Sequence, residues 1–469
     1  MREQIREETV LFISVIKWII FATAVGLIVG FSTSLFLKIL TWSANVTGKY
    51  SYFFVLLPIA LFISVMLTKY LAPDAEGHGT EKVIEAVHKT SGRIKAMVVP
   101  VKLAATIVTL AFGGSVGKEG PCAQIGAGLS SIFADFFKLS DKDRRKLVIC
   151  GISAGFASVF GTPVGGAIFG VEVLFVGTIL YDVLLPSFIA GITSYQISTA
   201  LGVHYFYHPV NFVPVFSEAF FAKVILAGIF FGLCSAVMIE ILNLGQKVAR
   251  KIKIWDPWKG VIGGIIIIPL VFIFSRDYLG LGLDSIESAL NGTRVAWHAF
   301  LTKSVFTSIT LNFGGSGGIV TPIFFVGTAA GSLFGQLLHL DPATFAAMGM
   351  VSVLAGCANT PISASIMSVE LFGPKLAPYA TVSCVISFLM TGHRSVYPSQ
   401  VLAVRKSPSI DFEMGHVMEN LETRVRIRDK TLLAILKFLK NTTYKIEKFL
   451  EKTGVIDKNK DRDDDTYLE

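Results

Sequence analysis

The amino-acid sequence predicts an all-α integral membrane protein, a polytopic bundle of tilted and broken helices with an inverted internal repeat. Three observations support this prediction. Apolar residues make up 52% of the 469 residues, and only 16% are charged. Several apolar runs are long enough to cross a bilayer, which takes roughly 20 helical residues. A glycine-dense phrase also occurs twice, once in each half of the chain.

The first half alternates between full-length and short apolar runs. The full-length runs, which we expect to span the membrane, are Phe12 to Leu37, Tyr52 to Leu71, Leu180 to Leu201 and Phe220 to Leu242. The N-terminus lacks a signal-peptide pattern, so the first run is expected to stay as an anchor. Between Met97 and Val176 the runs shorten to about 12 to 16 residues, which predicts tilted or half-crossing helices.

The second half, beginning at Gly260, repeats this plan. The phrase FGGSVGKEGP at Phe112 returns as FGGSGGIVTP at Phe313, 201 positions later (313 − 112). Two further segments return in the same order, from Gly77 at Gly280 and from Gly161 at Asn359. Repeats in transporters commonly pack with opposite orientation, which brings corresponding helix breaks together at mid-depth. We therefore expect the two glycine-dense phrases to meet.

The charge distribution predicts the topology. Three basic clusters carry much of the net charge of +8, and basic loops favour the cytoplasmic side. We expect a multi-pass protein of the cell (inner or plasma) membrane with both termini in the cytoplasm, and no nucleic-acid binding. The expected parts are a cytoplasmic N-terminus (1–9), membrane halves (10–245 and 260–405), a basic linker (246–259), and a cytoplasmic C-terminal helix with a polar tail (406–469). The tail is too short for an added regulatory domain.

The second glycine phrase suits an anion site. Its glycines expose backbone N–H groups before a helix that starts near Pro322. Unpaired N–H groups at a helix N-terminus attract anions without a formal cation, so binding can be weak enough to allow release. The alternative is a glycine-rich turn that only serves helix packing.

The first phrase differs by one carboxylate, Glu119, where the second has Val320. An intramembrane carboxylate at a helix N-terminus competes with a transported anion for the same donors. Protonation would neutralise Glu119 and release it, which makes it a candidate gate and proton acceptor. The alternative is a structural ion pair with Lys118.

Three motifs in order resemble those of the CLC family of chloride channels and proton-coupled antiporters. GKEGP at Gly117 is similar to the G-K/R-E-G-P motif, and GIVTP at Gly318 to G-x-F-x-P, with Val320 at the usual phenylalanine position. GHRSVY, ending at Tyr397, resembles the segment of the pore tyrosine. The resemblance, to members without appended CBS domains, implies a homodimer with one anion pathway per subunit.

The resemblance also implies roles for individual residues. Glu119 would be the external gate, the amides of Ile319 and Val320 would hold the central anion, and the Tyr397 hydroxyl would cap it. The complete implied anion-binding set is His78, Gly79, Gly117, Lys118, Gly318, Ile319, Val320 and Tyr397.

One departure from the family lies at Gly77 to Glu81, which matches the motif G-S-G-x-P only loosely. His78 replaces a serine that helps to bind the anion, and Glu81 replaces the proline. An imidazole N–H can still donate to an anion, so anion selectivity stays open. The alternative is that His78 points elsewhere and a backbone amide serves.

Val173 is the second departure, because proton-coupled members commonly carry a carboxylate there. Its absence favours passive, gated chloride conduction. The alternatives are chloride/proton exchange through Glu119 with an unconventional inner proton route, and selectivity for fluoride, nitrate or bicarbonate. Glu172 and Glu370 occupy equivalent repeat positions, which favours a shared structural role. No nucleophile–base set or metal motif supports an enzyme, and we expect no cofactor or metal.

Overall fold

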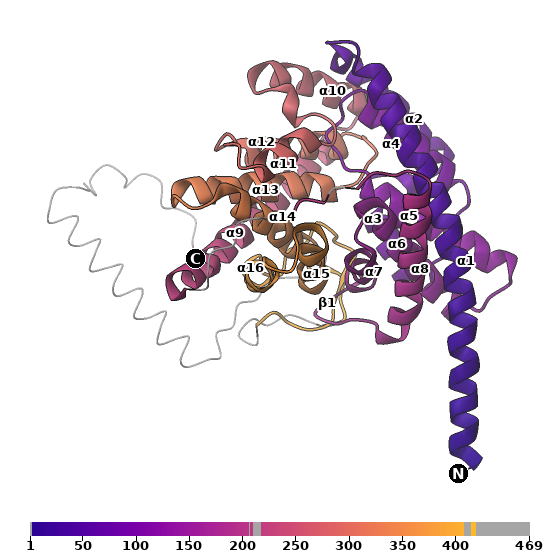
Figure 1. Ribbon diagram of the computed structural model, residues 1–469. Coiled ribbons are helices and arrows are strands. Elements are labelled where there is room, and N and C mark those ends of the chain that lie inside the picture. The colour runs from indigo at the N-terminus through magenta and orange to yellow at the C-terminus, as the bar shows by residue number, and fades with distance from the viewer. Residues whose placement is uncertain (1, 206, 210–216, 408–413, 419–469) are drawn as a thin grey trace, which may run out of the picture. The chain divides into compact units, whose positions relative to one another are not determined.

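The computed structural model describes residues 2–205, 207–209, 217–407 and 414–418 (Figure 1). The chain divides into two compact units, Met1–Val404 with Gly415–Asn420, and Arg405–Met414 with Leu421–Glu469. All elements below belong to the first unit. The predicted C-terminal helix, Thr431 to Gly454, lies outside the described residues.

Within the described residues the regular secondary structure is almost entirely helical. The first eight α-helices are α1 (Arg2–Thr47), α2 (Leu57–Leu71), α3 (Thr80–Lys89), α4 (Val98–Ala111), α5 (Glu119–Phe136), α6 (Asp141–Phe160), α7 (Pro163–Glu172) and α8 (Tyr181–Ala200). The next eight are α9 (Glu218–Lys251), α10 (Asp256–Ile273), α11 (Leu283–Leu290), α12 (Ala299–Asn312), α13 (Val320–Leu337), α14 (Pro342–Ala358), α15 (Pro361–Phe372) and α16 (Ala377–Met390). Short 3₁₀ turns are η1 (Phe53–Leu56), η2 (Pro73–Ala75) and η3 (Arg276–Tyr278), and β1 (Phe175–Val176) pairs in parallel with β2 (Val401–Leu402).

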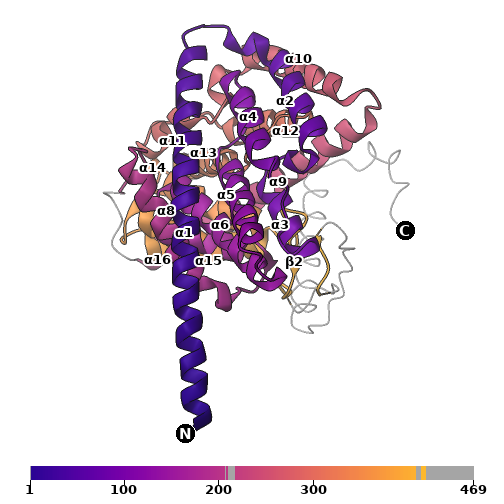
Figure 2. The ribbon, with the colours of Figure 1, turned by 90° about the vertical axis from the view of Figure 1, so that its right-hand side faces the viewer.

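The two sets of eight helices confirm the predicted repeat. Helices α4 and α12 both have 14 residues, and α5 and α13 both have 18. Helix α9 packs against α12, α13, α14 and α16, while α1 packs against α5, α6 and α8 (Figures 1 and 2). The predicted basic linker, residues 246–259, falls across the end of α9 and the start of α10.

Reciprocal hydrogen bonds show how the halves meet. The amide of Ser115 donates to the Thr310 hydroxyl, and the amide of Ser316 donates to the Thr109 hydroxyl, both at 3.1 Å. The two donors, Ser115 and Ser316, are equivalent positions of the repeat, and so are the two acceptors, Thr310 and Thr109. Such self-complementary exchange is the mark of a twofold relation between two parts. The two halves are thus inverted repeats that face each other at their glycine phrases.

Among the described residues, five helices are long and apolar enough to cross a membrane: the segment Gln4–Thr47 of α1, the segment Phe53–Leu71 ending in α2, and α9, α10 and α13. The first three correspond to runs that the sequence predicts as spans. The fourth predicted run, Leu180 to Leu201, forms α8, which is not among these five. Helices α5 and α6, with 18 and 20 residues, are longer than the apolar runs of about 12 to 16 residues that the sequence has between Met97 and Val176, and neither is among these five.

Glycines inside these helices mark the places where two helices come into contact. A Cβ added to Gly126 of α5 would lie 2.3 Å from the carbonyl oxygen of Gly151 in α6. In the second half, a Cβ on Gly327 would lie 2.4 Å from the Gly349 carbonyl oxygen. Glycines therefore let α5 approach α6, and α13 approach α14, with backbones almost touching.

A second set of contacts between the halves is made by two carboxylates. Glu172, at the end of α7, accepts the amides of Ile362 and Ser363 at 3.0 and 2.8 Å, at the start of α15. Glu370, on α15, accepts the amides of Val164 and Gly165 at 2.9 and 2.7 Å, at the start of α7. Each carboxylate satisfies N–H groups that a helix start leaves unpaired. The expected shared structural role of Glu172 and Glu370 is confirmed.

Candidate anion site

The two glycine phrases meet as the sequence predicts. Gly117 and Gly318 exchange two backbone hydrogen bonds, each 2.6 Å long, and so form an isolated antiparallel bridge. Helix α5 begins two residues after Gly117, and α13 begins two residues after Gly318. The N-termini of two helices, with their unpaired N–H groups, are therefore fixed beside each other inside the protein.

Glu119 sits at this junction with its side chain turned toward the other half. The residue is 3% exposed. Its Oε2 accepts the amide N–H of Thr321 at 3.1 Å, and its Oε1 accepts the Thr321 hydroxyl at 2.5 Å. Thr321 is the second residue of α13, so the carboxylate lies at the positive end of that helix. Glu119 is therefore bound to Thr321. The structure does not show the alternative, an ion pair between Glu119 and Lys118, the residue just before α5.

The segment before α3 packs against the same junction. A Cβ added to Gly120 would lie 2.2 Å from the carbonyl oxygen of His78, and one on Gly79 would lie 2.6 Å from the carbonyl oxygen of Gly120. Gly79 also has φ +75°, a conformation that glycine adopts without strain. Glycine at both positions is what allows the start of α3 to touch the start of α5.

Tyr397 closes this region from a third segment, after α16. Its side chain is fully buried, and its ring centroid lies 5.6 Å from that of His78. Among the described residues, neither the Tyr397 hydroxyl nor the His78 Nδ1 has a hydrogen-bond partner. A buried tyrosine normally pairs its hydroxyl, so this one is available as a donor to an anion or to water.

Val173, at the position of the missing carboxylate, is completely buried. Its carbonyl accepts the Gln400 side-chain amide at 2.8 Å. The residue thus contributes apolar packing and offers no group that takes up a proton.

The structure brings most of the sequence-predicted residues together: His78 and Gly79, Gly117 with Gly318, and Glu119 with the start of α13. Ile319 and Val320 are both buried at that start. The contact that reasoning from the sequence missed is Thr321. The sequence did contain a signal for this contact. The repeat equivalent of Thr321 is Gly120, so the second half has a hydroxyl at an otherwise apolar helix start where the first half has none.

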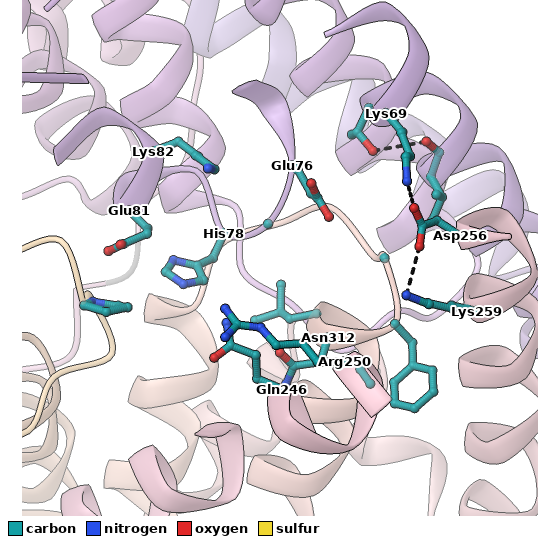
Figure 3. A pocket seen from close by; sticks show the side chains of 18 of the residues that line it. Lys69, Glu76, His78, Glu81, Lys82, Gln246, Arg250, Asp256, Lys259 and Asn312 are labelled. Carbon is teal, nitrogen blue, oxygen red and sulfur yellow. Dashed lines mark hydrogen bonds and ion pairs between the residues drawn. The ribbon is translucent and has the colours of Figure 1, made fainter. Parts of the chain in front are cut away.

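A cavity of about 480 Å³, lined in large part by polar and charged side chains, opens beside this region. Figure 3 shows His78 and Glu81 at one side of it and Gln246 and Arg250, from α9, at another. Lys102 holds the loop before His78 in place, because its buried amino group donates to the carbonyl oxygens of Ala75 and Gly77 at 3.1 and 2.5 Å. His78 therefore connects the buried junction to a polar entrance.

Paired helix N-termini, a buried carboxylate and a polar entrance between inverted halves define a class of protein, the helical membrane transport proteins for anions. The comparisons give the family. The model of the family "Voltage gated chloride channel" matches residues 59–392. The chain belongs to this family, the CLC family, as its motifs indicate.

Individual relatives agree. A "Chloride/fluoride channel protein" of Pseudomonas syringae pv. tomato is 37% identical over 82% of this chain and 86% of the relative. A "Voltage-gated ClC-type chloride channel ClcB" of Shigella flexneri is 28% identical over 68% of this chain and 79% of the relative. A solved CLC-type fluoride/proton antiporter is 26% identical with a TM-score of 0.78, covering 82% of this chain and 97% of that one. A cyanobacterial Cl−/H+ antiporter, 20% identical with a TM-score of 0.71 over 80% and 94%, shares the fold.

Proposed function

We propose that this protein exchanges a small halide, fluoride in the first place, for protons across the membrane. The observation that carries the proposal is the contact between the Glu119 carboxylate and Thr321. The N–H and O–H donors that an anion would use at the start of α13 hold the carboxylate instead. An anion enters this seat only when Glu119 leaves, and neutralisation by a proton makes leaving favourable. Anion entry and proton uptake are thereby linked.

Fluoride is favoured over chloride by the chemistry of the seat and by the relatives. Each oxygen of the Glu119 carboxylate accepts one hydrogen bond at the seat, Oε1 a short one from the Thr321 hydroxyl and Oε2 one from the Thr321 amide. Fluoride is close to a carboxylate oxygen in size and in hydrogen-bond strength. The Tyr397 hydroxyl supplies a further buried donor. The 37% identical relative is named for chloride and fluoride, and one solved relative is a fluoride/proton antiporter.

Passive, gated chloride conduction is the second candidate, and Val173 favours it. A buried valine at the usual carboxylate position gives the proton of Glu119 no conventional inner route. A relative named as a channel agrees with this reading. Under either candidate we propose a homodimer in the cell membrane with both termini in the cytoplasm, and with membrane halves close to 10–245 and 260–405.

Proteoliposomes loaded with fluoride test the proposal. With the outside made acidic and the membrane voltage clamped by potassium and valinomycin, entering protons should drive fluoride out against a fluoride gradient. The Glu119→Gln variant, which keeps the shape but cannot cycle a proton, should move fluoride only down its gradient. If the wild-type protein also fails to move fluoride uphill, exchange is wrong and passive conduction replaces it.

A further inference from the structure

A second carboxylate, Glu81, lines the cavity three residues after His78. It is the second residue of α3 and lines the cavity of about 480 Å³ together with His78 and Ser399. Figure 3 shows Glu81 beside His78 at the edge of this cavity. The family motif has proline at this position, so the carboxylate is a feature of this chain that the exchange reaction described above does not use.

The two oxygens of Glu81 have different surroundings. Oε1 accepts the backbone amide of Ser399 at 2.9 Å and also the Ser399 hydroxyl. Oε2 is buried and has no partner among the described residues. Ser399 follows Tyr397 by two positions. The rings of Tyr397 and His78 are neighbours, and the Tyr397 hydroxyl and the His78 Nδ1 also have no partner among the described residues. One half of the carboxylate is thus anchored, and the other half is free to accept a proton.

The lysines that line the cavity are paired with other acids. On the helix that carries Glu81, Lys82 and Lys89 bind Glu85 at 3.1 and 2.8 Å. Across the cavity, Lys69 and Lys259 both bind Asp256. In the part of the chain that the structure describes, no ion pair includes Glu81. The carboxylate is therefore not committed to a salt bridge that would keep it permanently ionised.

The remaining titratable groups near Glu81 can be placed by element. His78 precedes α3, Lys102 on α4 is bound to carbonyl oxygens, and Arg250 on α9 lines the far side of the cavity. Glu119 is the first residue of α5 and is bound to Thr321. Glu76 and Glu81 both line the cavity, and of these two carboxylates only Glu81 has a buried oxygen without a partner among the described residues.

We propose that Glu81 relays protons between the cavity and Glu119, the task for which Val173 has no titratable group. The proposal rests on the proton exchange proposed above. Glu81 takes up a proton that enters through the cavity and holds it on the buried Oε2, and the proton passes through the Tyr397 hydroxyl and site water to the Glu119 carboxylate. Glu81 returns to its ionised form, so only a proton moves. Relays of this kind are a known use of acidic side chains within membranes.

The ratio of protons to fluoride tests the proposal in reconstituted full-length protein, with a fluoride electrode and a pH electrode in one chamber. In Glu81→Gln the proton flux per transported fluoride should fall by about tenfold or more, while fluoride movement remains measurable. Glu81→Asp, which keeps a carboxyl, should restore coupling. Glu85→Gln is the matched control, one helical turn away in the same cavity, and should keep the wild-type ratio.

The outcomes separate this proposal from the previous one. If the wild-type protein moves no protons, the exchange function fails whatever Glu81 does. If the wild-type protein and Glu81→Gln have the same ratio, the relay is overturned and the exchange stands. Should Glu81→Gln fail to fold, Ser399→Ala gives an independent answer. Loss of its hydroxyl makes ionised Glu81 less stable, so the pH profile of proton flux should shift upward by about one unit. An unchanged profile contradicts the relay.

Discussion

A shared seat for Glu119 and the anion predicts strong energetic coupling between Glu119 and Thr321. In the wild-type protein, Thr321→Val removes one O–H donor from the carboxylate and from any anion that displaces it. The two losses oppose each other, so the apparent affinity for the anion should change little. In a Glu119→Ala background no carboxylate competes, and Thr321→Val should weaken anion binding by the full value of one hydrogen bond.

The size of that effect follows from the contact. A hydrogen bond to a charged acceptor contributes about 1.5 to 3 kcal/mol, which corresponds to a change of about 10- to 150-fold in the dissociation constant. The Thr321 hydroxyl lies 2.5 Å from Glu119 Oε1, so the contact is of this strong kind. A double-mutant cycle should therefore give a coupling free energy of about 1.5 to 3 kcal/mol.

Isothermal titration calorimetry of fluoride into the four purified proteins measures the cycle. Thr321→Ser keeps the hydroxyl and is the control, with affinities close to wild type in both backgrounds. A coupling free energy near zero would refute the reasoning, because it would mean that the anion does not use the donor that holds the carboxylate.

Further predictions concern gating and stability. Glu119→Gln should make anion flux insensitive to pH, as measured by efflux from liposomes at several pH values; a retained pH dependence would place the gate elsewhere. Glu172→Ala leaves two helix-start amides unpaired, so the free energy of unfolding should fall by about 2 kcal/mol or more, visible as a lower thermal midpoint, and Glu370→Ala should behave alike. Gly126→Ala forces a Cβ to within 2.3 Å of the Gly151 carbonyl oxygen and should also lower the midpoint, by an amount equivalent to about 1 to 3 kcal/mol. An unchanged midpoint in any of these variants would contradict the packing described.

The sequence predicted the repeat and the meeting of its glycine phrases because both depend on order along the chain. An offset of 201 positions places Gly117 and Gly318 at equivalent points, and inversion brings equivalent points together. The same reasoning anticipated the paired roles of Glu172 and Glu370. Motif order gave the family.

Other features could not be predicted, since they depend on contacts between distant segments. Glycine has two opposite uses, and only the structure shows that Gly126 joins α5 to α6 instead of ending a helix. The partner of Glu119 was equally hidden, because an ion pair with adjacent Lys118 and a bond to Thr321, 202 positions away, are both consistent with the motif. The contact of Glu81 with Ser399 was also hidden, because the two residues are 318 positions apart in the chain.

The measurement that tests the central claim most directly is the reversal potential of the purified wild-type protein in a planar bilayer. A fixed fluoride gradient sets one potential, and a pH gradient is then imposed. Exchange through Glu119 predicts that the reversal potential moves away from the fluoride equilibrium value when the pH gradient is applied. A potential that stays at the fluoride value whatever the pH gradient would contradict the account and show that the anion passes without protons.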